Sequence, residues 1–383
     1  MKIIAFYLPQ YHRVKENDEW WGEGFTEWTN LKKAKPLFDG HYQPRIPLNH
    51  NYYDLSMDGP KEWQCRIARE HGIYGFCIYH YWFNGHLLLE KPVEQYLQNP
   101  KCDLPFCICW ANENWTNVWS AGDKATVLLS HKKETPKEWE EHFCYLLPFF
   151  KDKRYIKDGN GKLLFVIFRP DLIVECNEML KYWENLAIKE GLPGFSFAYQ
   201  SPEFDDQSGK DDSVFKYAIE YQPIYALKEM TGRNFKGIRN VKKKLDRYME
   251  KKGMAAIDLH QMFKGKNNLY TFEYDKVWET VLNRVPQSDK YITGCFVDWD
   301  SSPRRGLGGR IFLGASPEKF EKYFAELIKK EKREYHKGMI FAFAWNEWTE
   351  GGYLEPDEKF GYGYLEAIRR VLEDTGEFPD YEI

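Results

Sequence analysis

Two glutamates near the C-terminal end of the sequence have the type and the spacing for acid/base chemistry. Glu347 and Glu350 follow an apolar, strand-like stretch and lie within residues 345–351, WNEWTEG. Where a strand turns into a loop or helix, a three-residue spacing can bring both carboxylates to one side. Glycoside hydrolysis needs such a pair, and Gly351-Gly352 would let the backbone turn sharply and a ligand approach. The alternative interpretation is a helix-capping acid beside a surface glutamate.

A second carboxylate arrangement stays open. Many barrel glycosidases take an acid from an Asn-Glu pair on one strand and a nucleophile from a strand across the barrel. Asn112-Glu113 and either Asp298 or Asp300 could fill those two roles. The two aspartates, separated by Trp299, would also suit hydroxyl binding or a divalent ion. No His-rich spacing accompanies them, so we expect no metal site.

Short apolar runs alternate with amphipathic helical stretches along the whole chain. The runs have the composition of strands buried on both faces, and they cover residues 2–8, 75–81, 105–110, 163–168, 194–199, 217–221, 293–299 and 338–345. The clearest helices are expected at 60–71, 136–150, 171–190 and 316–334. This alternation predicts an α/β fold, a closed (β/α)8 TIM barrel rather than an open doubly wound sheet. We expect one domain, 1–383, with long loop insertions at about 17–51 and 223–276.

Polar side chains collect at the predicted strand ends, where the active sites of such barrels lie. Each of the eight ends carries a hydrogen-bonding or ionisable group, which stability alone does not explain. The substrate-binding candidates at these ends are Tyr11, His12, His80, Tyr81, Trp82, Asn112, Glu113, Trp115, Arg169, Gln222, Asp298, Trp299, Asn346 and Trp348. Glu27 and Trp28, in the first insertion, could reach the same pocket.

The aromatic content of 17%, with 14 Trp and 26 Tyr, is high. Flat apolar faces rimmed by hydrogen-bonding groups suit sugar rings, although an aromatic-rich core is the plain alternative. Six tryptophans are expected mostly on loops, which favours sugar stacking: Trp20, Trp21, Trp28, Trp82, Trp115 and Trp119. For His12 and His80 we expect hydrogen bonds to sugar hydroxyls.

Charge and cysteine usage exclude several classes of protein. A net charge of -4 and a pI near 6.3 give no electrostatic basis for nucleic-acid binding. The cysteines in apolar strand-like runs are expected to be free thiols, and no stretch approaches the length of a membrane span. Residues 1–9 are too short and too soon interrupted by proline for a signal peptide. This predicts a cytoplasmic location in a bacterium, or a periplasmic one if a signal peptide has been removed.

Four sequence blocks together resemble a known family. They are residues 5–12 (AFYLPQYH), 23–28 (EGFTEW), 110–115 (WANENW) and 344–351 (AWNEWTEG). These blocks and their spacing resemble the WbsX-type family, which is named for glycosyltransferases of O-antigen and capsule loci. That family is similar to glycoside hydrolase family 99. The resemblance covers nearly the whole chain.

Family 99 enzymes are (β/α)8 barrels that act on α-mannosides with retention and without a protein nucleophile. The resemblance implies that Glu347 is a base on the sugar 2-hydroxyl, which attacks the anomeric carbon to give an anhydro-sugar. It implies that Glu350 is the acid for the leaving oxygen and later the base for water. Thr349 stands where family 99 usually has histidine, which bears on the substrate.

Three functions follow from these expectations. The first is a glycosidase on an α-linked, mannose- or rhamnose-like glycan, with an oligosaccharide or polysaccharide substrate and no cofactor. The second is a glycosyltransferase or transglycosylase in O-antigen or capsular polysaccharide biosynthesis. A nucleotide-sugar transferase needs a diphosphate site, and no glycine-rich or well-placed Asp-x-Asp turn is found. The third is a non-catalytic sugar-binding barrel, which predicts aromatics without a close carboxylate pair.

Overall fold

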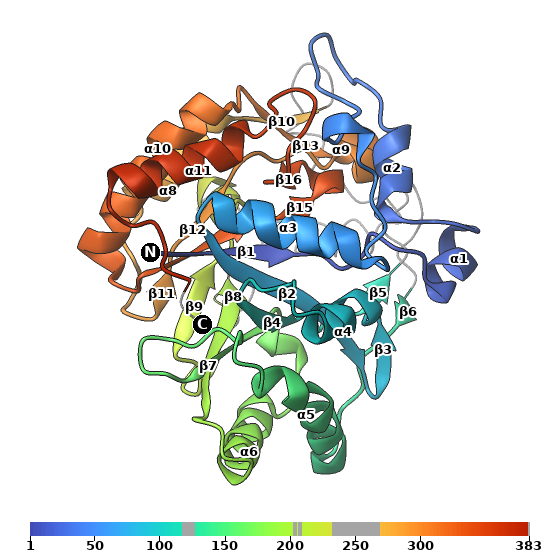
Figure 1. Cartoon of the computed structure of the whole chain (residues 1–383), viewed down its shortest axis with the longest axis vertical. Coiled ribbons are helices and arrows are strands. Elements are labelled where there is room, and N and C mark those ends of the chain that lie inside the picture. The colour runs from blue at the N-terminus through green and yellow to red at the C-terminus, as the bar shows by residue number, and fades with distance from the viewer. Residues whose placement is uncertain (117–126, 202–204, 206–208, 232–268, 382–383) are drawn as a thin grey trace, which may run out of the picture.

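The structure, a computed structural model, describes residues 1–116, 127–201, 205, 209–231 and 269–381. Nine parallel strands of this part of the chain form a nearly closed, barrel-shaped sheet (Figure 1). They are β1 (Lys2–Tyr7), β2 (Ile73–Phe83), β4 (Phe106–Trp110), β7 (Leu163–Ile167), β8 (Phe195–Ser201), β9 (Tyr217–Glu220), β11 (Tyr291–Ile292), β12 (Gly294–Phe296) and β14 (Met339–Phe343). Their order is β11-β9-β8-β7-β4-β2-β1-β14-β12.

The two ends of this path are consecutive pieces of one chain segment. β11 pairs with β9 and β12 pairs with β14, both in parallel, and Thr293 alone separates β11 from β12. Strands β11 and β12 therefore occupy the seventh strand position together, and their pairings join the two ends of the sheet. The predicted (β/α)8 barrel is confirmed, and each of the eight predicted strands overlaps an observed one.

Aromatic side chains fill part of the barrel interior. The ring of Phe6 on β1 lies 5.7 Å from that of Tyr79, 5.2 Å from that of Tyr221 and 5.4 Å from that of Phe341. These rings come from different strands, so their packing ties the strands together in the way that layered side chains fill such barrels. All four are buried. Part of the high aromatic content therefore belongs to the hydrophobic core, which was the alternative to sugar stacking.

Helices surround the sheet, with α5 and α6 at one end of the view in Figure 1 and α8, α10 and α11 at the other. The helices that cover it are α3 (Asp58–Glu70), α4 (Lys91–Gln98), α5 (Pro136–Phe150), α6 (Cys176–Lys189), α8 (Tyr274–Asn283), α10 (Pro317–Lys330) and α11 (Gly363–Asp374). Thr135 caps α5 in a capping box with Glu138. The helix predicted over 171–190 begins later, because residues 170–172 form a separate 3-10 turn. Among the described helices, none is long and apolar enough to cross a membrane.

The first insertion folds onto the rim of the barrel beside the ends of β12 and β14. It contains α1 (Lys15–Trp21) and α2 (Glu27–Lys33). Helix α2 packs against α9 (Ser302–Arg305), which follows β12, and against the turn after β14 (Figure 1). The predicted second insertion lies largely outside the described residues, since 232–268 are not described.

Candidate active site

A pocket of about 260 Å³ opens at the carboxyl ends of the barrel strands. It is lined by Leu8, Gln10, Tyr79, Tyr81, Ala111, Glu113, Asn114, Trp115, Thr116, Phe168, Tyr221, Ile224, Glu347 and Glu350. These residues follow or end strands β1, β2, β4, β7, β9 and β14, so distant segments of sequence converge here. A concave site with a few polar groups among apolar ones is the usual form of a ligand pocket.

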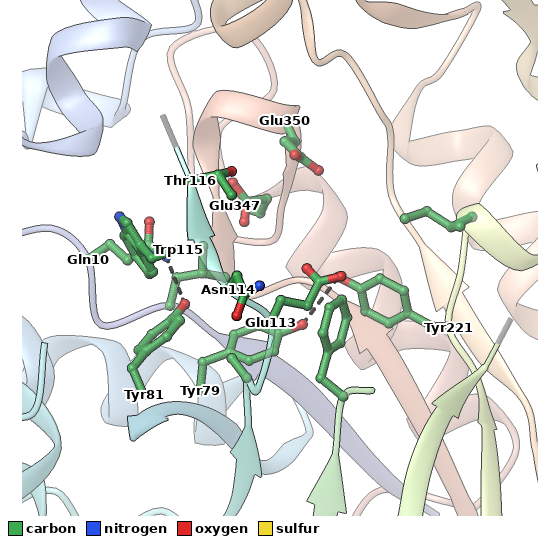
Figure 2. Close-up of a pocket in the computed structure, with 14 residues that line it drawn as sticks. Gln10, Tyr79, Tyr81, Glu113, Asn114, Trp115, Thr116, Tyr221, Glu347 and Glu350 are labelled. Carbon is green, nitrogen blue, oxygen red and sulfur yellow. Dashed lines mark hydrogen bonds between the residues drawn. The ribbon is translucent and has the colours of Figure 1, made fainter. Parts of the chain in front are cut away.

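A short hairpin after β14 presents both predicted catalytic residues to this pocket. Strand β15 (Asn346–Glu347) pairs antiparallel with β16 (Gly352–Tyr353), and a 3-10 turn, Trp348–Glu350, joins them. Glu347 therefore lies on a strand, and Glu350 lies on the turn that follows. Figure 2 shows the two carboxyl groups on the same side of the pocket. The alternative of a helix cap beside a surface glutamate does not fit, because Glu347 is buried and Glu350 is half-buried.

One arginine joins the two glutamates to a third carboxylate. Nη2 of Arg304 lies 2.8 Å from Oε1 of Glu347, and Nη1 lies 2.8 Å from Oε1 of Glu350. Nη2 also lies 3.1 Å from Oε2 of Glu27, at the start of α2. Arg304, Glu347 and Glu27 are each more than nine-tenths buried. The rigid fork of a guanidinium can bind several carboxylates at once, which fixes their relative positions.

Burial and like charge set the protonation of this cluster. Burial raises the pKa of Glu347 to about 8, and the charges of Glu350 and Glu27 add to the rise while Arg304 opposes it. For Arg304 itself burial alone would lower the pKa, but the three carboxylates outweigh it and raise the pKa above its ordinary value. Glu347 therefore holds a proton at neutral pH more readily than an exposed glutamate does.

Two further donors bind the cluster. Oγ1 of Thr349 donates to Oε2 of Glu27 at 2.8 Å and lies 3.3 Å from Oε1 of Glu347. The indole N–H of Trp299 donates to Oε2 of Glu350 at 3.2 Å. Both Glu347 and Glu350 thus have a hydrogen-bonding partner in addition to Arg304. The partner at residue 349 is the small hydroxyl group of a threonine.

The wall that faces the two glutamates in Figure 2 is aromatic, with polar tips. Gln10 donates to the hydroxyl of Tyr81 at 2.8 Å, and Tyr79 donates to the hydroxyl of Tyr221 at 3.2 Å. Burial raises the pKa of all three tyrosines, so their hydroxyls stay protonated. With Trp115 on the same wall, this surface offers both flat apolar faces and hydroxyl partners to a ligand.

The alternative pair, Glu113 and Asp298, is not brought together. Glu113 lines the pocket and forms an ion pair of 2.9 Å with Arg169. Asp298 lies outside the lining and is paired with Arg45 at 2.7 Å. The observed pocket thus combines Glu113 with Glu347 and Glu350, and its lining includes neither Asp298 nor Asp300.

Several predicted substrate-binding residues face away from the pocket. His80 and Trp82 belong to β2, where side chains alternate, so Tyr79 and Tyr81 face inward and these two face the helices. Nε2 of His80 is 2.9 Å from Nε2 of His142 on α5, and Trp82 stacks on the same imidazole. The prediction of a loop position for Trp82 is wrong. Burial lowers the pKa of His80 to about 3, as expected for a core histidine.

His12 is also placed behind the pocket wall. Its Nδ1 lies 2.8 Å from the carbonyl oxygen of Pro9, and the residue is only 2% exposed. Burial lowers its pKa to about 4. Its buried Nε2 has no hydrogen-bond partner among the described residues, and the expected hydrogen bond from His12 to a sugar hydroxyl stays a prediction.

A third group of predicted residues holds the rim together without lining the pocket. Asn346 accepts from the N–H of Leu8 and donates to its carbonyl oxygen, which ties β15 to the end of β1. The Tyr11 hydroxyl donates to the Asn346 carbonyl oxygen at 2.6 Å. Asn112 forms a similar pair of hydrogen bonds with the backbone of Arg169: it accepts from the N–H and donates to the carbonyl oxygen.

Trp28, Trp348 and Gln222 are likewise engaged within the fold. The indole of Trp28 donates to the Tyr53 carbonyl oxygen, and that of Trp348 donates to Oε2 of Glu355 at 2.6 Å. Oε1 of Gln222 accepts from the N–H of Ala226. These three residues therefore hold the hairpin and the rim of the barrel in position. The remaining predicted tryptophan, Trp119, lies outside the described residues.

The two glycines after Glu350 serve backbone packing rather than ligand approach. Gly351 has φ +67, and a Cβ there would lie 2.9 Å from the Asp300 nitrogen and 3.0 Å from Arg45. A Cβ on Gly352 would lie 2.2 Å from the ring of Phe343. The predicted sharp turn is confirmed, but protein atoms occupy the space that a ligand was expected to use.

The predicted site residues do not include four residues of the observed site: Arg304, Gln10, Tyr79 and Tyr221. Arg304 follows the Asp298-Trp299-Asp300 motif by four residues, so its place in a loop after a barrel strand was the available signal. Tyr79 needed the register of β2, which the sequence alone does not give. Among the described residues, no group of three or more His, Cys, Asp or Glu is arranged to hold a metal ion.

Comparison with protein-family models identifies a match over nearly the whole chain. The model described as "Glycosyltransferase WbsX" matches residues 3–368. The protein named "Uncharacterized protein WxcX" from Xanthomonas campestris pv. campestris (strain B100) is 32% identical over 381 residues, which are 97% of this chain and 49% of the relative. The chain thus spans about half the length of the curated relatives it matches.

Two solved structures share the fold. A GH99 endo-alpha-mannosidase from Bacteroides thetaiotaomicron superposes with a TM-score of 0.52 at 13% identity, covering 98% of this chain and 97% of that one. A glycoside hydrolase-like protein gives a TM-score of 0.55 at 12% identity, covering 97% and 93%. At this level of identity the likeness shows the fold alone. The resemblance stated from the four sequence blocks is confirmed.

Proposed function

The chain belongs to the WbsX glycosyltransferase family, and from this premise we propose that it is a carbohydrate-active enzyme that cleaves an α-linked, mannose- or rhamnose-like glycan with retention. The observation that carries the proposal is the pair Glu347 and Glu350 held by one guanidinium at the edge of the pocket. The facing aromatic wall with its hydroxyl tips supports a sugar as the ligand.

Glu347 takes the role of base in this scheme. Its carboxylate removes the proton of the sugar 2-hydroxyl, and the resulting oxygen attacks the anomeric carbon, so that a 1,2-anhydro sugar forms. Glu350 donates its proton to the leaving glycosidic oxygen as the bond to the anomeric carbon breaks. The second step reverses the roles: Glu350 removes a proton from the acceptor, which opens the anhydro ring, and Glu347 returns the proton to the 2-oxygen. Two inversions give net retention.

Arg304 can stabilise either protonation state of the pair. It stabilises whichever carboxylate is ionised, and it lies 2.8 Å from both, so the proton can leave one glutamate without leaving an unpaired buried charge. The pKa of Glu347, about 8, makes its ionised form a stronger base than an ordinary glutamate, and the fraction of the enzyme in that form grows as pH rises through about 8.

Transfer to a sugar acceptor is the second candidate, and the family description favours it. The same anhydro intermediate would be opened by a sugar hydroxyl in place of water. This reaction would build or remodel a bacterial surface polysaccharide.

An activity screen tests the proposal. The protein is incubated with a panel of α-linked manno- and rhamno-oligosaccharides and with nucleotide sugars, and the first-formed anomer is followed by ¹H NMR. We expect cleavage of an α-linked glycan with the α-anomer formed first, and addition of a second oligosaccharide shows whether transfer competes with hydrolysis. First formation of the β-anomer, or turnover of a nucleotide sugar alone, would contradict it.

A further inference from the structure

The Asp298-Trp299-Asp300 motif has the spacing of a metal or diphosphate motif, but its side chains have other partners. Asp298 and Asp300 turn toward the first insertion, where Arg45 and His41 bind them. Trp299 turns the opposite way, and its indole N–H reaches Oε2 of Glu350. The motif thus lies between the first insertion and the predicted acid.

Arg45 is the centre of the contacts on the insertion side. Its Nη2 lies 2.7 Å from Oδ2 of Asp298 and 3.9 Å from Oδ2 of Asp300. Its Nη1 donates to the carbonyl oxygen of Gly351, the residue after Glu350, at 3.2 Å. Arg45 is only 5% exposed. A single buried guanidinium therefore binds both the motif and the turn that carries Glu350.

The backbone of Glu350 is held from the same side. The N–H of Asp300 donates to the Glu350 carbonyl oxygen at 2.7 Å. The Asp300 carboxylate is fixed in turn by Nε2 of His41 at 2.8 Å and by Nε2 of Gln43 at 2.7 Å. Burial opposes ionisation of Asp300, but the hydrogen bond from His41 and the charge of Arg45 lower its pKa to about 2. Asp300 is thus ionised at neutral pH and held in place by these hydrogen bonds.

We propose that Arg45 is a positioning residue that acts on the carboxyl group of Glu350 through Asp298, Trp299 and the Gly351 carbonyl. The inference rests on the role of Glu350 in the proposed function. The first insertion, by way of Arg45, fixes the turn and the indole donor that orient Glu350. Arg45 itself does not line the pocket and touches no reacting atom.

The test combines kinetics with a spectroscopic readout on three variants. Arg45→Met removes the guanidinium and with it the contacts to Asp298, Asp300 and the Gly351 carbonyl oxygen. Because it leaves Asp298 buried without its partner, Arg45→Met/Asp298→Asn is made as well, which removes the charge pair and keeps the volume. Trp299→Phe removes the donor to Glu350 alone. Arg13→Met, at an exposed arginine that precedes this insertion in the sequence, is the matched control.

We expect kcat to fall about 10-fold to 100-fold in the double variant and in Trp299→Phe, with KM little changed, because a misplaced acid slows chemistry and not binding. The indole ¹⁵N–¹H resonance of Trp299, assigned by its loss in Trp299→Phe, reports the contact without any substrate. The chemical shift of this resonance should change in Glu350→Gln, and it should change in the same direction in the double variant. Arg13→Met should change neither readout.

Two results would overturn the inference. One is an unchanged Trp299 resonance in the folded double variant, and the other is wild-type kcat in that variant. If Glu350→Gln retains full activity, the proposed function fails, yet the Trp299 resonance still shows whether Arg45 orients Glu350. The failures of the two proposals are therefore distinguishable.

Discussion

Arg304 binds Glu347 with a separation of 2.8 Å between Nη2 and Oε1, while its other terminal nitrogen binds Glu350 at the same distance. Three carboxylates surround this one cation, since Glu27 shares Nη2. The cluster would carry excess negative charge if every carboxyl were ionised, and burial makes that charge costly. The raised pKa of Glu347 is the consequence, because one carboxyl keeps a proton that an exposed glutamate would lose.

Removal of Arg304 is expected to disable the site. Arg304→Gln leaves three clustered carboxylates, of which Glu27 and Glu347 are buried, without their cation, so we expect kcat/KM to fall at least about 100-fold. The free energy of unfolding should fall by about 3–5 kcal/mol, which denaturant titration measures. Arg305→Gln, a change at the exposed neighbouring arginine, is the control and should match wild type. Wild-type kcat/KM in Arg304→Gln would contradict the assigned role.

The pH profile distinguishes base from acid at Glu347. A base must be ionised, and the pKa of Glu347 is about 8, so kcat/KM should rise with pH through about 8. Because the charge of Glu27 contributes to the raised pKa, Glu27→Gln should move this limb to lower pH. Glu23→Gln, in the exposed part of the same insertion, should leave it in place. A fall of kcat/KM through the same pH range would instead make Glu347 the acid.

The raised pKa of Glu355 predicts how the stability of the fold depends on pH. Glu355 lies beneath the hairpin, where Trp348, Tyr53 and Gln64 donate to it, and burial raises its pKa from 4.5 to about 7. The folded chain therefore binds a proton that the unfolded chain has released, so stability is full below pH 4.5 and is lost as pH rises through 7. The loss amounts to about 3 kcal/mol.

Glu355→Gln removes this pH dependence. The melting temperature of wild type relative to Glu355→Gln should fall between pH 5 and pH 8, as measured by circular dichroism at matched ionic strength. Glu358→Gln, at an exposed neighbouring glutamate, should retain the wild-type slope. A constant difference between wild type and Glu355→Gln across this range would show that Glu355 is ionised in the folded chain.

Thr349 offers a test of how its hydroxyl positions Glu27. Thr349→Val keeps the shape and removes the donor to Glu27, so we expect kcat to fall several-fold, the effect of about 1 kcal/mol. Thr349→Ser keeps the donor and should retain most of the activity. The comparison isolates the hydroxyl, and equal rates in the two variants would show that the hydrogen bond has no part in catalysis.

The barrel and the location of the site could be predicted from sequence, but the facing of individual side chains could not. The apolar runs marked the strands because parallel strands covered by helices are apolar on both faces, and the same pattern hides which residues point inward. His80 and Tyr81 are neighbours at a strand end, yet Tyr81 lines the pocket and His80 packs on α5. One residue of register decides between them.

Arg304 illustrates a second limit of prediction from sequence. Nothing in a run of two arginines after a proline distinguishes a buried cation from a solvated one. Its role follows from α2 and α9 packing together, which brings Glu27, 277 residues away in sequence, onto the same guanidinium. Contacts between loops of different strands are set by tertiary structure, so local spacing carries no signal for them.

The catalytic roles of Glu347 and Glu350 are tested most directly by the turnover of Glu347→Gln and Glu350→Gln on an α-linked glycan that the wild type cleaves. We expect each variant to fold as wild type and to lose activity by several orders of magnitude, whereas Glu113→Gln, at the other glutamate of the pocket, should retain chemistry with a changed KM. Wild-type kcat in both Glu347→Gln and Glu350→Gln would contradict these roles.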